Sequence, residues 1–400
     1  MAHPLPRPVP RRAHPRRRRP GRRLAGAAQP APPIGADAVT AHGTAADAAR
    51  PTPDRNPGPA GATADRPLLA VRDLTVRFRM PGGRSVAAVT DAAFDLAPGE
   101  CLVLVGESGC GKSVLASALL GLLPGNAEAT GTALLTDACG TTDLLAAGEA
   151  ELARSVRGRR IGLIPQSPAA HLTPVRTVRA QLEETVRELT DTPRGPALRS
   201  AAERIAERAA FPAGHLDRHP HQLSGGLAQR AATALALAGD APLLLADEPT
   251  TGLDRDLVDR TVDELRRHLA AAPSPAAANG TGRALLMITH DLTAAQRIAD
   301  RVAVMYAGRI VELADAPRFF GTPGPRHPYA RGLLDALPER AFTPIPGMPP
   351  ELGALPDGCA FAARCDRATA RCATLPAPRD GVACHHPGPP KTETDHARTA

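Results

Sequence analysis

A short apolar run followed at once by a glycine-rich octet constrains the fold of this chain more than any other feature. CLVLV spans residues 101–105, GESGCGKS spans 106–113, and SVLASALLGLL, which has helical spacing, spans 113–123. A continuous apolar strand is typical of a parallel sheet that is covered on both faces. Strand, glycine loop and helix in this order predict a loop whose backbone N–H groups converge on phosphate oxygens at a helix N-terminus.

The octet also contains Lys112, one of only two lysines among 48 basic residues. A compact ammonium on a flexible stem fits inside such a loop, where the broad planar fork of arginine does not. We therefore expect Lys112 to reach the β- and γ-phosphates of a nucleotide, and Ser113 to ligate Mg²⁺. The predicted nucleotide-binding residues of this segment are Gly106, Glu107, Ser108, Gly109, Cys110, Gly111, Lys112, Ser113 and Val114.

Further apolar runs predict buried strands at residues 160–166, 242–248 and 284–291, with helical stretches between them. Such alternation predicts an α/β core with a mainly parallel sheet. Residues 68–78 and 85–96 lie on either side of a Pro-Gly-Gly turn, and their rough alternation of apolar and polar residues predicts two more strands.

The run at 242–248 ends in two acids, Asp247 and Glu248. Burying two unpaired carboxylates at a strand end is costly, so a metal or a reaction must justify them. We expect Asp247 to hold Mg²⁺ through water and Glu248 to polarise the attacking water. A plain solvated strand end is the alternative when this motif is taken alone.

The two acids belong to a longer segment, ADEPTTGLD at residues 246–254, which LSGGLAQR precedes at 223–230 and THD follows at 289–291. Together with the octet and Gln166 these make five motifs in a fixed order. With them the chain resembles the ATP-binding subunit of ABC transporters over residues 67–313. The resemblance implies a P-loop ABC ATPase core with an antiparallel β subdomain and a helical insertion at about 167–237. It also implies ATP and Mg²⁺ as cofactors.

Residue roles follow from the resemblance at matching positions only. Gln166 is similar to the loop glutamine that senses Mg²⁺ and the γ-phosphate, and His290 to the switch histidine on the γ-phosphate. Phe78 resembles the aromatic residue that stacks on adenine, although a simple core position is the alternative. The resemblance further implies that ATP is sandwiched between the phosphate loop of one subunit and the LSGG segment of another. The residues that would act across this interface are Ser224, Gly225, Gly226 and Asp254.

At some positions the residues differ from those most common in the family. Pro165 precedes Gln166, Ser167 stands where Asp is frequent, and the usual Leu-Asn-Pro is Leu-Thr-Pro at 172–174. These positions face the membrane subunit in the family, so they leave hydrolysis intact but put the identity of the partner in doubt.

The C-terminal part narrows the subfamily. RHPYARGLLDALP at 326–338 and IPGMPPELGALPDGCAFAARC at 345–365 resemble the tail of ATPases that serve bacterial oligopeptide and dipeptide importers, a group that also contains nickel and opine importers. A drug exporter's ATPase shares the catalytic motifs but is not expected to carry this tail. A DNA-repair or translation ATPase would need a long coiled coil or a second cassette, and neither is visible.

Four cysteines crowd into this small Cys-rich appendage: Cys359, Cys365, Cys372 and Cys384. Their spacing is neither that of a zinc ribbon nor that of a ferredoxin. In the resembling subfamily such a tail can bind a [4Fe–4S] cluster. Zinc, with help from His385 or His386, and thiols without metal are the alternatives.

Charge and composition set the expected domains and partners. Nine of the 48 basic residues lie in residues 1–23, which contain no acid, so the rest of the chain is nearly neutral. Aromatic residues are 2% of the chain, which argues against a nucleic-acid partner. We expect a disordered extension at 1–66, an ATPase domain at 67–325, the oligopeptide-transporter-type region at 326–390 and a disordered tail at 391–400.

The expected partners are two membrane permease subunits, a second ABC ATPase subunit and, indirectly, an extracytoplasmic solute-binding protein. Because no apolar run approaches the roughly 20 residues that cross a bilayer, we expect a peripheral protein on the cytoplasmic face of the membrane.

Overall fold

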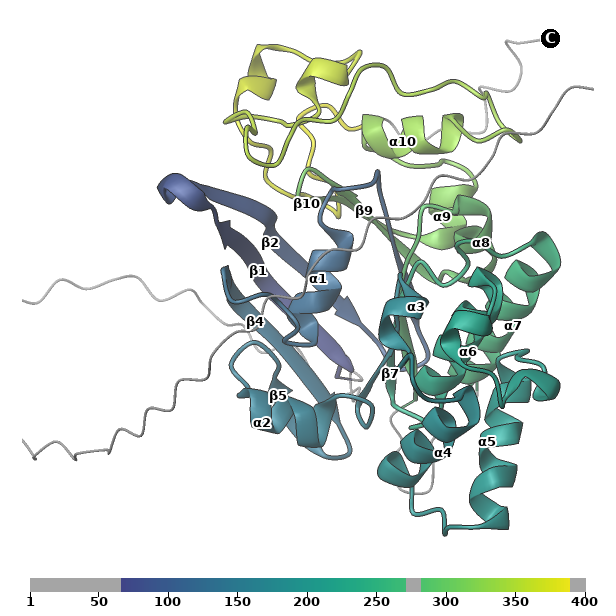
Figure 1. Ribbon diagram of the computed structural model, residues 1–400. Helices are drawn as coiled ribbons and strands as arrows, with labels where there is room; N and C mark the ends of the chain where they lie inside the picture. The colour runs from purple at the N-terminus through teal and green to yellow at the C-terminus, as the bar shows by residue number, and fades with distance from the viewer. Residues whose placement is uncertain (1–65, 271–281, 389–400) are drawn as a thin grey trace, which may run out of the picture. The chain divides into compact units, whose positions relative to one another are not determined.

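The computed structural model describes residues 66–270 and 282–388. The expected N-terminal extension, apart from residue 66, and the expected tail at 391–400 therefore lie outside the described residues. Two sheets organise the described chain, one mainly parallel and one antiparallel (Figure 1).

The larger sheet has six strands in the order β10-β9-β3-β8-β7-β6, and all neighbours are parallel except β9 and β10. This confirms the predicted mainly parallel core, with one antiparallel edge strand in addition. Because β3, β6, β7 and β8 run parallel to one another, their carboxyl ends lie along one edge of the sheet, and the glycine-rich octet, Gln166, the two acids and the THD motif follow those ends. The strands are β3 (Cys101–Val105), β6 (Ile161–Ile164), β7 (Leu243–Asp247), β8 (Ala284–Ile288), β9 (Arg301–Tyr306) and β10 (Arg309–Asp315).

The smaller sheet has four antiparallel strands in the order β2-β1-β4-β5. It is the antiparallel subdomain that the family resemblance implies. Its first two strands lie where the alternating pattern predicts them, and the other two follow the first helix of the core. The strands are β1 (Leu69–Arg79), β2 (Ser85–Leu96), β4 (Ala127–Asp137) and β5 (Gly140–Asp143).

Helices cover the sheets and form the insertion (Figure 1). Helix α1 (Lys112–Leu119) starts inside the glycine-rich octet, and the short α2 (Glu149–Glu151) follows β5. The insertion contains α3 (Pro168–His171), α4 (Val178–Leu189), α5 (Pro196–Arg208) and α6 (Gly225–Leu237). The remaining helices are α7 (Arg255–Ala270), α8 (Leu292–Ile298), α9 (Ala316–Phe320) and α10 (Pro328–Asp335).

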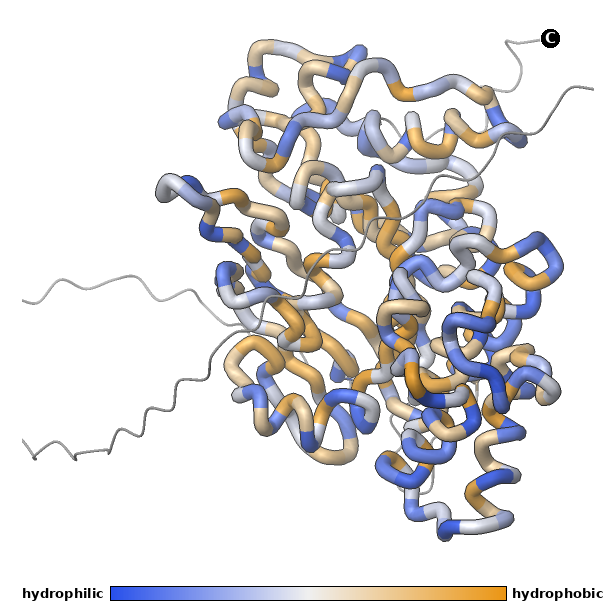
Figure 2. Tube along the Cα trace, in the orientation of Figure 1, coloured by the Kyte–Doolittle hydropathy of each residue, from blue (hydrophilic) through white to orange (hydrophobic). Residues whose placement is uncertain are grey.

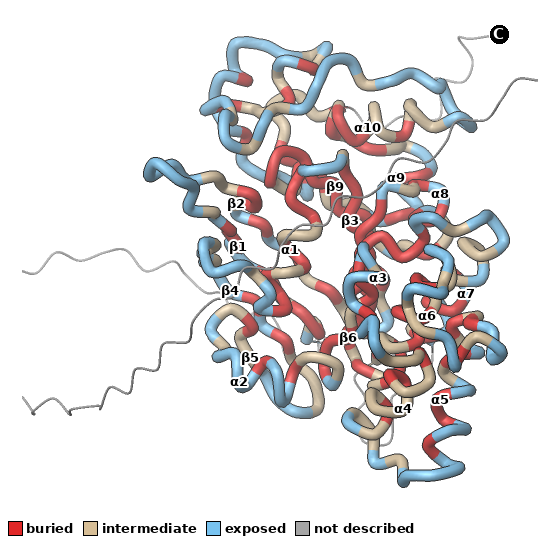
Figure 3. The backbone as a smooth tube through the Cα atoms, in the orientation of Figure 1, coloured by how far each residue is buried: buried red, intermediate tan, exposed pale blue. Residues whose placement is uncertain are grey.

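Strand β3 shows how the core is divided between the two faces of the larger sheet. Leu102 and Leu104 pack with α1 and the antiparallel sheet, while Val103 and Val105 pack with α7, α8 and α10. All five β3 residues are buried, as a parallel strand covered on both faces requires (Figure 3). Figure 2 shows that apolar segments lie in the interior of the protein and that the periphery is more polar.

A third apolar cluster holds the helical insertion together. Val178 and Leu182 of α4 pack with Ala202 and Ala206 of α5 and with alanines of α6. Among the described residues, no helix is long and apolar enough to cross a membrane.

The free energy of unfolding is expected to fall as the pH drops below about 6.5, because two buried histidines accept a proton in the folded state only at a much lower pH than in the unfolded chain. Burial lowers the pKa of His268 to about 3 and that of His327 to about 4. In the unfolded chain both have an ordinary pKa near 6.5. Between these values the unfolded state binds more protons than the folded state, so a falling pH stabilises the unfolded state. Urea unfolding at pH 7.5 and at pH 5 measures the loss of unfolding free energy between the two pH values. The loss should be smaller in His268→Leu than in the wild-type protein. An equal loss in that variant would contradict the role given to His268.

Candidate functional site

The glycine-rich octet connects β3 to α1, as the sequence predicts. Gly106 has φ of +156°, and a Cβ there would lie 2.2 Å from the carbonyl oxygen of Met305 on β9. Gly111 has φ of +108°, and a Cβ there would lie 2.2 Å from the carbonyl oxygen of Ala88 on β2. These glycines are therefore required by close backbone approach as well as by left-handed φ at Gly111.

Lys112 is buried within the loop that it belongs to. Its ammonium donates to the carbonyl oxygen of Gly106 at 2.7 Å and to that of Glu107 at 3.0 Å. The Sγ of Cys110 lies 3.8 Å from the same nitrogen, and burial raises the pKa of that thiol. The ammonium is thus held by acceptors at the centre of the loop, where an anion could replace them as its partner.

The two predicted carboxylates lie side by side at the end of β7, and both are buried. Asp247 Oδ1 has no hydrogen-bond partner among the described residues. Burial raises the pKa of Asp247, while a hydrogen bond from the Ser113 hydroxyl lowers it. A buried carboxylate oxygen with no partner, beside Ser113, suits the binding of a hard cation such as Mg²⁺.

Glu248 has φ of +52°, in a region that residues other than glycine rarely adopt. Its backbone N–H donates to the carbonyl oxygen of Ile288 on β8, 2.8 Å away, which fixes the turn. Its Oε2 lies 2.8 Å from Nδ1 of His290, whose side chain is 65% exposed. The predicted carboxylate and the predicted switch histidine are therefore in direct contact.

A cavity of about 190 Å³ brings the first group of predicted residues together. Lys112, Gln166 and Glu248 all line it, although they follow three different strands. The remaining lining residues are Ser108, Gly109, Gly111, Ser113, Val114 and Leu352. A cationic loop, a carboxylate and a carboxamide around one cavity at a helix N-terminus can bind a polyphosphate and direct water toward it.

Phe78 lies on β1 and does not line this cavity. It pairs with Val86 of β2 and packs against the core cluster between the sheets. Its adenine-stacking role stays a prediction.

A second group of predicted residues lies at the N-terminus of α6, outside the lining of the cavity. Ser224 is exposed and caps the helix, its Oγ accepting from the N–H of Leu227 at 3.3 Å. A Cβ at Gly226 would lie 3.3 Å from Leu253, so the TGLD loop adjoins this helix end. Asp254 accepts from the N–H of Leu257, at 3.0 Å, and immediately precedes α7. The structure therefore separates the predicted site residues into two groups.

Comparisons with known proteins identify the family. A family model described as ABC transporter matches residues 89–251, and one described as the C-terminal region of oligopeptide/dipeptide transporters matches residues 311–372. A peptide import ATP-binding protein of Brucella melitensis is 38% identical over 337 residues, which cover 80% of this chain and 96% of that protein. The chain belongs to the ABC transporter ATPases of the oligopeptide/dipeptide group.

Other proteins agree with this membership. The oligopeptide transport ATP-binding protein OppD of Haemophilus influenzae is 38% identical over 319 residues, which cover 78% of this ATPase and 93% of the relative. A solved ATP-binding cassette dimer, bound to ADP and Pi in a post-hydrolysis state, matches with a TM-score of 0.54 and 23% identity. It covers 62% of this ATPase and 98% of that chain, and this likeness shows the shared fold.

Sequence reasoning missed the residues by which the C-terminal region of the ATPase contacts the phosphate loop. Arg364 forms an ion pair with Glu107, and the hydroxyl of Tyr329 accepts from the backbone N–H of Glu107 at 2.8 Å. Tyr329 belongs to the His-Pro-Tyr segment, which singled out the subfamily without indicating this contact. Nothing in the sequence distinguishes Arg364 from the many other arginines.

The four cysteines of the appendage lie near one another. The N–H of Cys359 donates to the carbonyl oxygen of Cys372 at 2.9 Å. Burial raises the pKa of the Cys359, Cys365 and Cys384 thiols, and neighbouring thiols of the same set add to the rise. Within residues 66–270 and 282–388, however, no group of three or more His, Cys, Asp or Glu side chains is arranged to hold a metal ion.

Proposed function

We propose that this ATPase powers the import of oligopeptides or dipeptides, using ATP bound at the cavity beside Lys112. The main support is that Lys112, Gln166 and Glu248 all line that cavity, and that His290 contacts the carboxylate of Glu248. The oligopeptide/dipeptide C-terminal region and the peptide-import relatives favour a peptide cargo. A nickel or opine importer of the same group is the alternative.

Each residue of the cavity has a role in this proposal. Lys112 exchanges its carbonyl partners for phosphate oxygens, to which an ammonium binds more strongly. Glu248 polarises the attacking water, and His290, whose Nδ1 lies 2.8 Å from Oε2 of Glu248, donates from Nε2 to the γ-phosphate. Asp247, Ser113 and Gln166 would hold Mg²⁺, which would neutralise charge that develops on the phosphates.

The second group of residues completes the site in another subunit. The N-terminus of α6 presents backbone N–H groups that suit an anionic γ-phosphate. Because Ser224 does not line the cavity of its own chain, we infer that it meets ATP bound to a second ABC ATPase subunit. Closure around two ATP molecules would exclude water, and hydrolysis would reopen the dimer.

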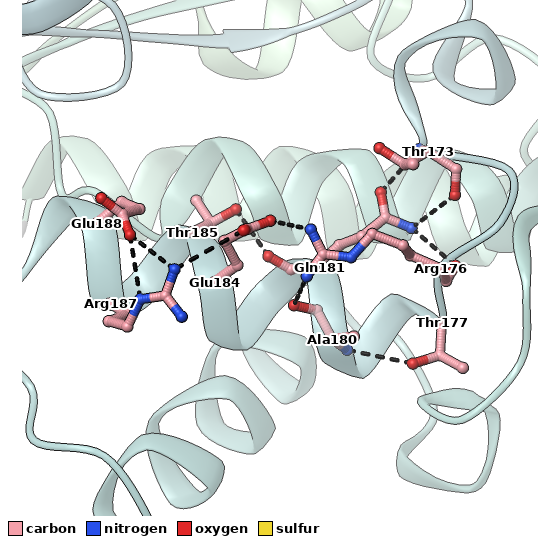
Figure 4. A network of polar contacts seen from close by, with 9 residues as sticks. All are labelled: Thr173, Arg176, Thr177, Ala180, Gln181, Glu184, Thr185, Arg187 and Glu188. Carbon is pink, nitrogen blue, oxygen red and sulfur yellow. Dashed lines mark hydrogen bonds and ion pairs between the residues drawn. The ribbon is translucent and has the colours of Figure 1, made fainter.

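The loop after α3 is the surface that we propose for a membrane permease subunit (Figure 4). Gln181 of α4 accepts from the N–H of Thr173 at 2.8 Å and donates to the carbonyl oxygens of Thr173 and Arg176, while Arg176 pairs with Glu184. These contacts hold Val175, which is 80% exposed, on the outside of the loop. The loop contains residues 172–174, which face the membrane subunit in the family that the sequence resembles, and this supports the proposal. Such docking would place the ATPase peripherally at the cytoplasmic face.

The cargo can be tested by uptake in the source cell. A strain without this ATPase should lose uptake of a radiolabelled tripeptide, and the wild-type gene should restore it. Glu248→Gln, expressed at the same level, should not restore it. Loss of ⁶³Ni²⁺ uptake with unchanged peptide uptake would replace the peptide proposal with the nickel alternative.

For the appendage we propose an iron–sulfur centre on the four cysteines, supported by their grouping in one lobe. Since the described thiols are not arranged to hold a metal, the lobe would have to rearrange around the cluster. Anaerobically purified protein should contain iron and acid-labile sulfide in equal amounts, and Cys372→Ser should remove both. Cys139→Ser, which changes an exposed thiol far from this set in sequence, is the matched control. One zinc per chain would establish the zinc alternative. Protein that contains neither iron nor zinc would show that the thiols are free.

A further inference from the structure

The side chain of Glu107 is engaged by the C-terminal region, although its neighbours in the phosphate loop line the ATP cavity. Nη1 of Arg364 donates to Oε2 of Glu107 at 2.7 Å, and Nη2 donates to Oε1 at 2.9 Å. Such a paired contact fixes orientation as well as position. The Arg364 side chain is only 4% exposed and that of Glu107 is 27% exposed, so the ion pair is buried on the arginine side and partly exposed on the carboxylate side.

Two tyrosines fix the same point. The fully buried Tyr329 accepts from the N–H of Glu107, so both the backbone and the carboxylate of this residue are held by C-terminal groups. The hydroxyl of Tyr306, on β9, lies 3.2 Å from Nη1 of Arg364. The three side chains therefore set the position of the loop between Gly106 and Ser108.

Arg364 also connects the loop to a segment that reaches the ATP cavity. Its Nε donates to the carbonyl oxygen of Pro346 at 2.8 Å. Six residues later Leu352 lines the cavity together with Lys112 and Glu248. The next residue, Gly353, lies against Val86 of β2, beside the strand that carries Phe78.

We propose that Arg364 is a positioning residue for ATP binding, which makes the C-terminal region part of the nucleotide site. By holding Glu107, Arg364 keeps the phosphate loop in the conformation that accepts polyphosphate. By holding Pro346, it keeps Leu352 as a wall of the same cavity. A preorganised loop binds its ligand without a further ordering cost. The inference rests on the proposed placement of ATP at this cavity, and it does not depend on the cargo.

The test is a double-mutant cycle on ATP affinity in the full-length chain. Arg364→Gln, Glu107→Gln and the double variant are made in the Glu248→Gln background, and the dissociation constant of Mg-ATP is measured by calorimetry. Each single change should weaken ATP binding about tenfold, which is the typical effect of losing a charged hydrogen-bonded pair. The double variant should be no weaker than the weaker single variant, since both remove the same contact. Arg364→Lys should recover part of the affinity.

Controls separate positioning from general stability. Arg371→Gln, at an exposed arginine of the same lobe, should bind ATP like the parent. Unfolding free energies are measured for every variant, and ATP affinities within twofold of the parent would overturn the inference even if stability falls. If Arg364→Gln does not fold, Glu107→Gln and Arg364→Lys decide the question by the same criterion. Lys112→Ala tests the placement of ATP itself: if it still binds ATP normally, the cavity is not the site, which is a separate failure.

Discussion

Glu248→Gln is expected to reduce ATP turnover by about 10²- to 10⁴-fold while ATP remains bound. The change removes the carboxylate that polarises water but keeps the shape of a side chain that lines the cavity. Since Lys112 and the loop glycines are untouched, binding of the phosphates should persist. Steady-state phosphate release and filter binding of labelled ATP measure the two effects separately.

The conformation at position 248 does not complicate this comparison, because glutamate and glutamine have the same backbone preferences at a positive φ. His290→Ala removes the other partner of the Glu248–His290 contact and should also slow ATP turnover. Wild-type phosphate release in Glu248→Gln would remove this residue as the polarising group.

Gly225→Asp is expected to abolish ATP-dependent closure of the dimer and to reduce turnover by about 10² or more, as loss of one preorganised transition-state contact does. Gly225 is the first residue of α6, and a Cβ there would meet nothing within 4 Å, so the aspartate fits the isolated chain. An acid at a helix N-terminus even stabilises the helix. In the proposed sandwich the same carboxylate would face the γ-phosphate of another subunit and repel it.

Gly225→Ala is the matched control, because it adds the Cβ without the charge. ATP affinity of the single chain should be unchanged in both variants, since the cavity lining does not include this helix end. Turnover should fall strongly only with aspartate. Equal turnover in the two variants would show that no phosphate approaches α6 during hydrolysis.

Much of the core could be predicted because its signals are local. The continuous apolar run at β3, followed by the glycine loop and α1, lies where the sequence predicts it. The pair Asp247 and Glu248 ends β7, as the two acids after an apolar run indicate. Five ordered motifs then indicate the family. Four of them follow parallel strands and therefore share one edge of the sheet, while LSGG lies apart from them at the N-terminus of α6.

What could not be predicted depends on contacts between distant parts of the chain. Glu107 and Arg364 are 257 positions apart, and nothing local to either residue indicates the other. The strands β4 and β5 lie among ordinary threonines and alanines, so β4 is defined by its pairing with β1, and β5 by its pairing with β4. Phe78 carries a pattern that suits both a core residue and an adenine platform, and the structure places it against the core.

The central claim is that each ATP is held between the phosphate loop of one subunit and the α6 N-terminus of another. Cryo-electron microscopy of the assembled transporter, with Glu248→Gln and Mg-ATP, tests it most directly. We predict that Ser224 of this chain contacts the γ-phosphate of ATP bound to the other ATPase subunit, while Lys112 contacts ATP on its own loop. A closed, ATP-loaded complex in which Ser224 lies far from every nucleotide would contradict the claim.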